Sequence, residues 1–136
     1  MSSIFSEQAP DPVGPYPHAR IVGNLLFLSG VGPRKKGSAE IPGVTLDGSG
    51  NIVEYDIATQ CHAVFENVKI ILEASGSKWE NLVDVTVYLT NMKRDFASFN
   101  AIYKLYFIEN QPCRTTVEVN ALPTPIAVEL KCIATV

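Results

Sequence analysis

Two charged residues stand inside runs that otherwise have the pattern of β-strands, Arg114 in CRTTVEV and Glu129 in AVELKCIATV. The planar guanidinium of an arginine can grip a carboxylate through two hydrogen bonds. A carboxyl group in a partly apolar wall has its pKa raised towards the range that suits proton transfer. The two residues therefore predict either a functional site that binds a carboxylic acid and transfers a proton, or a purely structural arrangement. In the structural arrangement they form an ion pair, or Glu129 faces solvent on an edge strand. Spacing alone does not distinguish these alternatives.

The segments that carry these two residues alternate as strands do. In residues 113–119 one face holds Arg114 and the other holds Thr115 and Val117, which is a period of two. Residues 120–125 contain two prolines, which lack the N–H that a central ladder needs, so they predict a turn. In the strand that follows, Glu129 shares a face with Ala127 and Ile133. The sequence thus predicts two strands joined by LPTP.

The rest of the chain supplies the elements that must position these strands. Two apolar runs, 19–22 and 25–29, are joined by Gly23-Asn24 and predict a hairpin, and the Gly-rich residues 30–51 predict a long irregular loop. Asp56 is placed to cap a helix whose apolar residues recur every three or four positions until Gly76. A strand is predicted over 82–89. The predicted second helix has an aromatic stripe, which we assign to the core: Phe96, Phe99, Tyr103, Tyr106 and Phe107.

This order of elements predicts an α+β fold, a single mixed β-sheet with two helices packed on one face. Residues 1–136 form one domain, in which 1–13 are polar, contain prolines and predict an extended N-terminal arm. The other face of the sheet would stay bare in a monomer although its strands carry valines. We therefore expect the chain to form an oligomer in which this face of the sheet is covered.

Composition and charge argue against some classes of function. A net charge of −3 argues against a nucleic-acid surface, and no apolar run in the 136 residues predicts a signal peptide or a membrane span. Three cysteines without CxxC spacing suit free thiols in a reducing compartment, so we expect a cytoplasmic protein.

The sequence lacks the residue patterns that several kinds of catalysis require. The two histidines, His18 and His62, have no partners at ligand spacing, so we expect no metal, and we expect both to be solvated rather than catalytic. The glycines of 43–50 match no nucleotide-binding pattern, so we expect no cofactor. The basic run 34–36 is by default a solvated loop.

Five segments in order give the chain a resemblance to a known family. GPYPHAR, FLSG, DFASFNAIYKLYF, CRTTVEV and, after ALP, VELKCIA together resemble the RidA (YjgF) family of enamine and imine deaminases over nearly the whole chain. The resemblance implies a chorismate-mutase-like fold. It also implies a homotrimer with a central barrel and one site in each cleft between neighbouring subunits.

Family roles can be carried over only to matching positions. Arg114 matches the arginine that binds the substrate carboxylate, and Glu129 matches the carboxylate that positions or activates water. Further matches line the family's cleft: Tyr16, Ser29 and Asn100 by their side chains, Gly30 and Thr116 by their backbones. Thr116 replaces a cysteine found in some members, which matters little if that position acts through its backbone. By this resemblance Glu129, Arg114 and Tyr16 are the candidate catalytic residues.

The resemblance implies a cofactor-free hydrolytic deaminase of 2-imino or enamine carboxylates, which releases ammonia and a 2-keto acid. One alternative is a general deaminase of 2-iminobutanoate and 2-iminopropanoate. Another rests on PHAR, Arg34 and LPTP, which look more like 2-aminomuconate deaminases. A muconate has a second carboxylate, which Arg20, Arg34 or His18 could bind. An alternative of another class is a non-catalytic trimer that binds small carboxylates.

Overall fold

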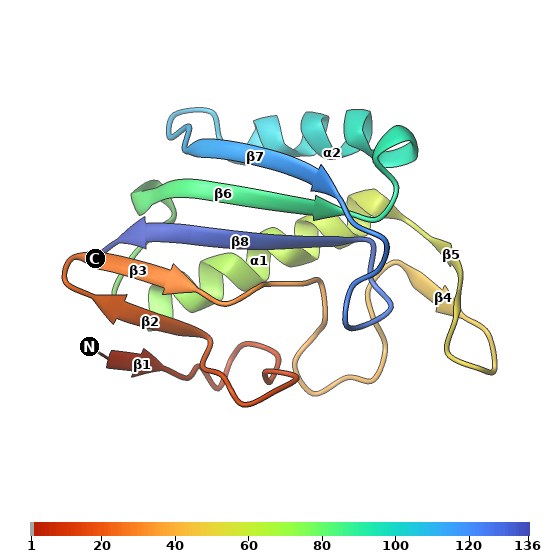
Figure 1. Cartoon of the computed structure of the whole chain (residues 1–136), viewed down its shortest axis with the longest axis horizontal. Coiled ribbons are helices and arrows are strands. Elements are labelled where there is room, and N and C mark those ends of the chain that lie inside the picture. The colour runs from red at the N-terminus through yellow and green to blue at the C-terminus, as the bar shows by residue number, and fades with distance from the viewer. Residues whose placement is uncertain (1) are drawn as a thin grey trace.

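The computed structural model of the chain describes residues 2–136 and contains two sheets and two long helices (Figure 1). The main sheet has the strand order β1-β2-β3-β8-β6-β7, and β4 and β5 form a separate ribbon. In chain order the elements are β1 (Ser2–Ile4), β2 (Ala19–Val22), β3 (Leu25–Leu28), β4 (Val44–Leu46), β5 (Ile52–Tyr55), α1 (Ile57–Ala74), a 3-10 turn (Trp79–Asn81), β6 (Leu82–Leu89), α2 (Met92–Tyr106), β7 (Cys113–Glu118) and β8 (Val128–Thr135).

The main sheet is mixed, because β6 and β7 run parallel while every other neighbouring pair is antiparallel. A parallel pair needs a crossover, and α2 supplies it. Both helices lie behind the sheet in Figure 1, and their apolar sides form one core with its inner face. The predicted α+β fold is therefore confirmed. No helix in residues 2–136 combines the length and apolar character that crossing a membrane requires.

Local sequence signals explain the elements that hold the two candidate strands. Asp56 caps α1 by accepting a hydrogen bond from the Thr59 N–H, and the chain turns away after the helix at Gly76, whose φ is 79°. The helix buries its periodic apolar side, as predicted: Ile57, Cys61, Val64, Val68, Ile71 and Leu72. Gly23 opens the predicted hairpin turn with φ 62°, which suits a type II′ turn.

Two segments in which we predicted no strand contain one each. Residues 2–4 of the predicted extended arm pair with β2, so this part of the arm forms the edge strand of the sheet. Within 30–51, residues 44–46 pair with β5 as a ribbon, so this loop is less irregular than predicted. The signal was present, since DGSGN between two apolar runs is a hairpin loop.

Two side chains have surroundings that differ from the prediction. His18 is buried instead of solvated: its Nδ1 accepts the Ser6 N–H, and its Nε2 lies 2.7 Å from the Pro10 carbonyl oxygen. The ring thereby ties the arm to the start of β2. Phe96 is 37% exposed although its spacing placed it in the core, because it lies near the N-terminal end of α2, three residues before the buried Phe99.

Candidate functional site

Arg114 and Glu129 lie on opposite faces of the sheet. Arg114 is the register partner of Val85, which is fully buried beneath the helices. Glu129 is the partner of Tyr88, three residues further along β6 and therefore on the other face. The ion pairs within residues 2–136 join other side chains, so an Arg114–Glu129 pair within one chain is excluded. A solvent-facing edge position for Glu129 is wrong too, since β8 lies between β3 and β6.

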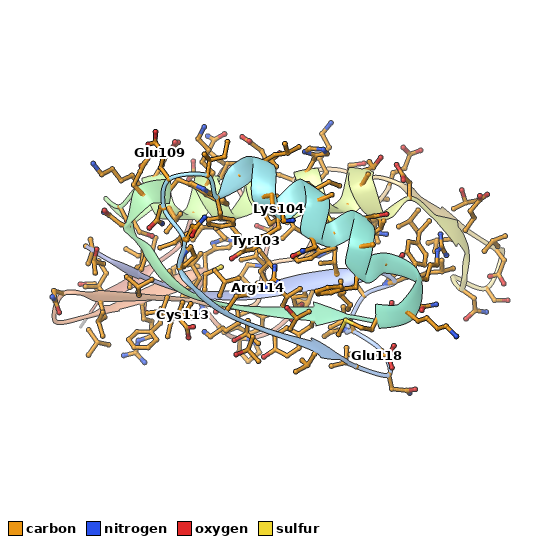
Figure 2. All side chains as sticks on the ribbon, turned by 90° about the horizontal axis from the view of Figure 1, so that it is seen from above. Tyr103, Lys104, Glu109, Cys113, Arg114 and Glu118 are labelled. Atoms are coloured by element: carbon orange, nitrogen blue, oxygen red, sulfur yellow. The ribbon has the colours of Figure 1, made fainter. Side chains whose placement is uncertain are left out.

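Helix α2 holds the Arg114 guanidinium. Its Nη1 donates to the Asn100 side-chain oxygen at 2.8 Å, and its central carbon lies 4.7 Å from the centre of the Tyr103 ring. Phe96 and Phe99 approach the guanidinium at 5.8 and 6.0 Å. Figure 2 shows Tyr103 and Arg114 between α2 and the sheet. One hydrogen bond and an aromatic wall thus fix this cation, while the Nε and Nη2 donors have no partner within the described residues.

The Glu129 carboxylate is half-buried and forms no ion pair within residues 2–136. Burial raises its pKa above the usual range. Lys131, two residues along the same face, donates its ammonium hydrogen to the Leu28 carbonyl instead. Gly30 packs directly against the carboxylate, because a Cβ built at that glycine would lie 2.7 Å from Oε2. The close approach explains a glycine at this position without any unusual backbone angle.

Three loops gather around Glu129 and form a hollow of about 40 Å³, which has room for only a few water molecules. Tyr16, Gly30 and Arg34 line it together with the carboxylate. A hollow of the same size beside it, on the side of α1, shares these three residues and adds Ser29. The Ser29 hydroxyl donates to the Pro17 carbonyl at 2.7 Å, which fixes the segment that carries Tyr16.

The structure places the three candidates for a second cation, Arg34, His18 and Arg20, in different surroundings. Arg34 lines the Glu129 hollow, and its Nη2 donates to the Asp11 carbonyl at 2.7 Å. His18 is buried and engaged at both ring nitrogens, and Arg20 is exposed on β2, outside the lining of this hollow. Only Arg34 of the three therefore stands beside the carboxylate.

The predicted site residues fall into two half-sites. The first, which we call the arginine half-site, lies on the helix side and contains Arg114, Asn100 and Thr116, whose register partner is the buried Val87. The second, the glutamate half-site, contains the remaining candidates: Tyr16, Ser29, Gly30, Arg34 and Glu129. Within residues 2–136, no three His, Cys, Asp or Glu side chains gather as ligands for one metal ion.

Two residues beside these half-sites were missed by sequence reasoning. Tyr103 was assigned to the core alone, yet its ring also supports the Arg114 guanidinium. Asn67 lies on the buried side of α1, and its side-chain Nδ2 donates to the backbone carbonyls of Gly32 and Arg34. A polar residue inside an apolar helical stripe was the available signal for Asn67.

The chain matches a family model described as Endoribonuclease L-PSP over residues 6–136. It belongs to the RidA (YjgF) family. A RutC family protein from Pyrococcus horikoshii is 43% identical to this RidA chain over 132 residues, which cover 96% of the chain and 94% of the relative. The 2-iminobutanoate/2-iminopropanoate deaminase of Escherichia coli is 34% identical over 135 residues, 97% and 95% of the two chains.

Solved structures agree with the RidA assignment. The YjgF gene product from E. coli has a TM-score of 0.84 at 33% identity, with 99% of this chain and 98% of that chain covered. E. coli TdcF, whose structure contains bound serine, has a TM-score of 0.85 at 31% identity, with 100% and 99% covered. The family resemblance inferred from five segments is thereby confirmed, and the fold is that of the RidA family.

Proposed function

We propose that this RidA chain is a cofactor-free deaminase that hydrolyses 2-imino and enamine carboxylates to 2-keto acids and ammonia. The observation that carries the proposal is the separation of the two half-sites. One face of the sheet offers a fixed cation for a carboxylate, and the other offers a half-buried carboxylate whose pKa is raised and which forms no ion pair within residues 2–136. These are the two groups that imine hydrolysis requires, and a complete site needs both.

A homotrimer would bring the half-sites together between neighbouring chains. The sheet face opposite the helices is uncovered in one chain, and Figure 2 shows its side chains without a helix beneath them. Apolar side chains are exposed on this face, including Val22 at 48% and Val117 at 37%. Copies of the chain that cover each other's open faces would bury this surface. In such a cleft one chain supplies the arginine half-site and its neighbour the glutamate half-site.

Arg114 would bind and orient the substrate. Because Asn100 takes Nη1, the Nε and Nη2 donors stay available for a two-pronged grip on the carboxylate next to the imine carbon. The wall formed by Tyr103 and Phe99 restricts the rotation of the guanidinium. A fixed carboxylate fixes the imine carbon, and such positioning supplies much of the acceleration when the carbon is already electrophilic.

Glu129 would move protons. Its carboxylate accepts a proton from water as the water oxygen bonds to the carbon of the protonated imine, which gives a tetrahedral aminoalcohol. The carboxyl group then returns the proton to the nitrogen, the C–N bond breaks, and ammonia leaves as the C=O bond forms and the hydroxyl proton passes to the Glu129 carboxylate. An enamine must first take a proton at carbon to become the imine. A raised pKa brings Glu129 nearer to the working pH, which favours both directions of transfer.

The relatives support this function. The E. coli deaminase shares 34% identity over nearly the full chain, and the TdcF structure shows that a protein of this fold binds a small amino acid. The family description names an endoribonuclease, but an excess of 14 acidic over 11 basic residues disfavours a polyanionic substrate here.

The proposal is tested by a coupled assay. An amino acid oxidase generates 2-iminobutanoate or 2-iminopropanoate, and release of the keto acid and ammonia is followed with and without the chain. We expect faster release, with the acceleration lost in Glu129→Gln and Arg114→Ala. Release at the uncatalysed rate for several imino acids and for 2-aminomuconate, with folded protein present, would rule out the deaminase.

The finer proposal is a preference for substrates with a second carboxylate, such as 2-aminomuconate. The observation that favours it is Arg34, which lines the Glu129 hollow and whose guanidinium makes a single hydrogen bond, to the Asp11 carbonyl, within residues 2–136. We expect 2-aminomuconate to be hydrolysed faster than 2-iminobutanoate, and Arg34→Ala to lower that ratio. Equal rates that do not respond to Arg34→Ala would leave the general deaminase.

A carboxylate-binding trimer without catalysis is the second candidate. It would use the arginine half-site as described, and Glu129 would then be only a wall residue. Calorimetry with 2-oxobutanoate separates the two functions. A regulator would bind it without accelerating any imine hydrolysis, whereas the deaminase binds it as product and loses turnover in Glu129→Gln.

A further inference from the structure

Asn67 of α1 fastens the loop that carries Arg34. Its side chain is 8% exposed, and Nδ2 donates to the Gly32 carbonyl at 2.9 Å and to the Arg34 carbonyl at 2.7 Å. An amide nitrogen has two hydrogens, so both are used on this one loop. Val64 and Ile71, about one turn away on the same side of the helix, belong to the apolar core, whereas the amide of Asn67 donates to the loop.

The loop has few other attachments at this point. Val31 is the last residue that pairs with β8, through mutual backbone hydrogen bonds with Leu130 at 2.8 and 2.9 Å. Beyond it the chain leaves the sheet and passes over the end of the glutamate half-site. Gly32 is confined there, since a Cβ would lie 2.9 Å from the Ile126 side chain. From Gly32 to Arg34, Asn67 provides the hydrogen bonds that link this backbone to the core.

The position of the Arg34 guanidinium depends on where its backbone is held. The side chain reaches from the fastened backbone to the Asp11 carbonyl and lines the hollow beside Glu129. Arginine has several flexible bonds and a permanent charge, so a released backbone would let the guanidinium turn into solvent. The two hydrogen bonds from Asn67 thereby determine whether a cation stands at the glutamate half-site.

We propose that Asn67 is a positioning residue that sets the selectivity of the site for substrates with a second carboxylate, by holding the backbone on which Arg34 stands. This inference rests on the proposed deaminase function. Asn67 also lines the hollow on the side of α1, but both hydrogens of its Nδ2 are used on the loop, so its effect on selectivity passes through Arg34.

Two substitutions test this role. Asn67→Leu keeps the size of the side chain and removes both donors. Asn67→Asp keeps the shape but offers only acceptors to the two carbonyls, and it serves if the leucine variant does not fold. For each, kcat/KM is measured on 2-aminomuconate and on 2-iminobutanoate. We expect the ratio of the two values to fall about tenfold, mostly through a raised KM for the dicarboxylate, because a charge-assisted contact is lost.

A matched control separates positioning from simple stability. Asn110 also donates its side-chain amide to two backbone carbonyls, those of Trp79 and Leu82, at 3.4 and 3.0 Å, and it lines neither hollow of the glutamate half-site. Asn110→Leu should lower the melting temperature and leave the substrate ratio as in the wild type. A purely structural amide in α1 would behave in the same way.

A double-mutant cycle tests whether Asn67 acts through Arg34. In an Arg34→Ala background, Asn67→Leu should change the substrate ratio no further. A ratio that falls equally in both backgrounds, or variants of Asn67 that lower both kcat/KM values alike, would overturn the inference. A wild-type chain that accelerates neither substrate would instead refute the proposed function, so the two failures are distinguishable.

Discussion

The two half-sites are supported in different ways. Arg114 is held by a neighbouring helix: its guanidinium donates a hydrogen bond to the Asn100 side-chain oxygen and has three aromatic rings around it. Glu129 stands on a central strand, but its surroundings are loops, and no side chain in residues 2–136 forms an ion pair with it. An anchor benefits from rigidity before the substrate arrives, while a proton-transfer group needs an environment that shifts its pKa. Arg114 is held rigidly and burial raises the pKa of Glu129, so each half-site has the property that its role requires.

Glu129→Gln should produce the largest effect and would show that the glutamate half-site performs the chemistry. The amide keeps the shape and cannot take a proton. We expect kcat to fall about 10³-fold, within the range of general acid–base catalysis, while product affinity by calorimetry stays within a few-fold. Weak binding with intact turnover would reverse the two roles.

Arg114→Lys should have the next largest effect, and it tests whether Arg114 anchors the substrate carboxylate. The ammonium keeps the charge but cannot form a two-pronged grip or stack on Tyr103. We expect kcat/KM to fall about 100-fold, because misplacement by about 1 Å costs that much. Arg94→Lys is the matched control, since Arg94 stacks on Tyr55 at 4.0 Å and lies in neither half-site. Near-normal turnover in Arg114→Lys would show that Arg114 has only a structural role.

Gly30→Ala should have an intermediate effect confined to the glutamate half-site. The added Cβ would meet the Glu129 carboxylate at 2.7 Å, so the carboxylate must move. The displaced atoms are the end of a flexible side chain, so we expect little loss of stability, and we expect kcat to fall about tenfold for a displaced base. Gly48→Ala is the control, because its Cβ would meet nothing within 4 Å. Unchanged kinetics in Gly30→Ala would separate the glycine from the function of Glu129.

The smallest predicted effect is on stability and depends on pH. Burial raises the folded-state pKa of Glu129 above its unfolded value, so the ionised form is disfavoured in the fold. Stability from the protonated carboxyl is present below the unfolded pKa and is lost as pH rises through the folded pKa. Glu129→Gln should therefore melt higher than the wild type at pH 7, and the gap should close towards pH 4. A variant that melts lower at pH 7 would show that a cation already neutralises Glu129.

Elements with a strong local pattern were predictable, and features that depend on distant partners were not. The period of α1 and its Asp56 cap, and the alternation of β6, are properties of neighbouring residues. The strand at 2–4 has no such pattern and exists because β2 offers a free edge. His18 was predicted to be solvated because it follows two prolines in a loop, and it is buried because the arm folds over it.

The candidate site was predictable in its residues but not in its geometry. Arg114 and Glu129 stood out as charges in strands, yet their opposite faces follow from the register of β7 and β8 with β6, which spacing within one strand does not give. Asn67 was missed because its partners, the carbonyls of Gly32 and Arg34, lie more than 30 residues away in the chain. The roles of these residues stay predictions.

The central claim is that each site takes Arg114 from one chain and Glu129 from its neighbour. It is tested most directly by mixing two inactive variants, Arg114→Ala and Glu129→Gln, in equal amounts, unfolding and refolding them together, and assaying imine hydrolysis. In randomly mixed trimers, roughly a quarter of the clefts would join an intact arginine to an intact glutamate. We therefore predict recovery of about a quarter of the wild-type activity, with none when the variants are refolded separately. Mixed trimers, verified by mass spectrometry, that stay inactive would contradict a site shared between chains.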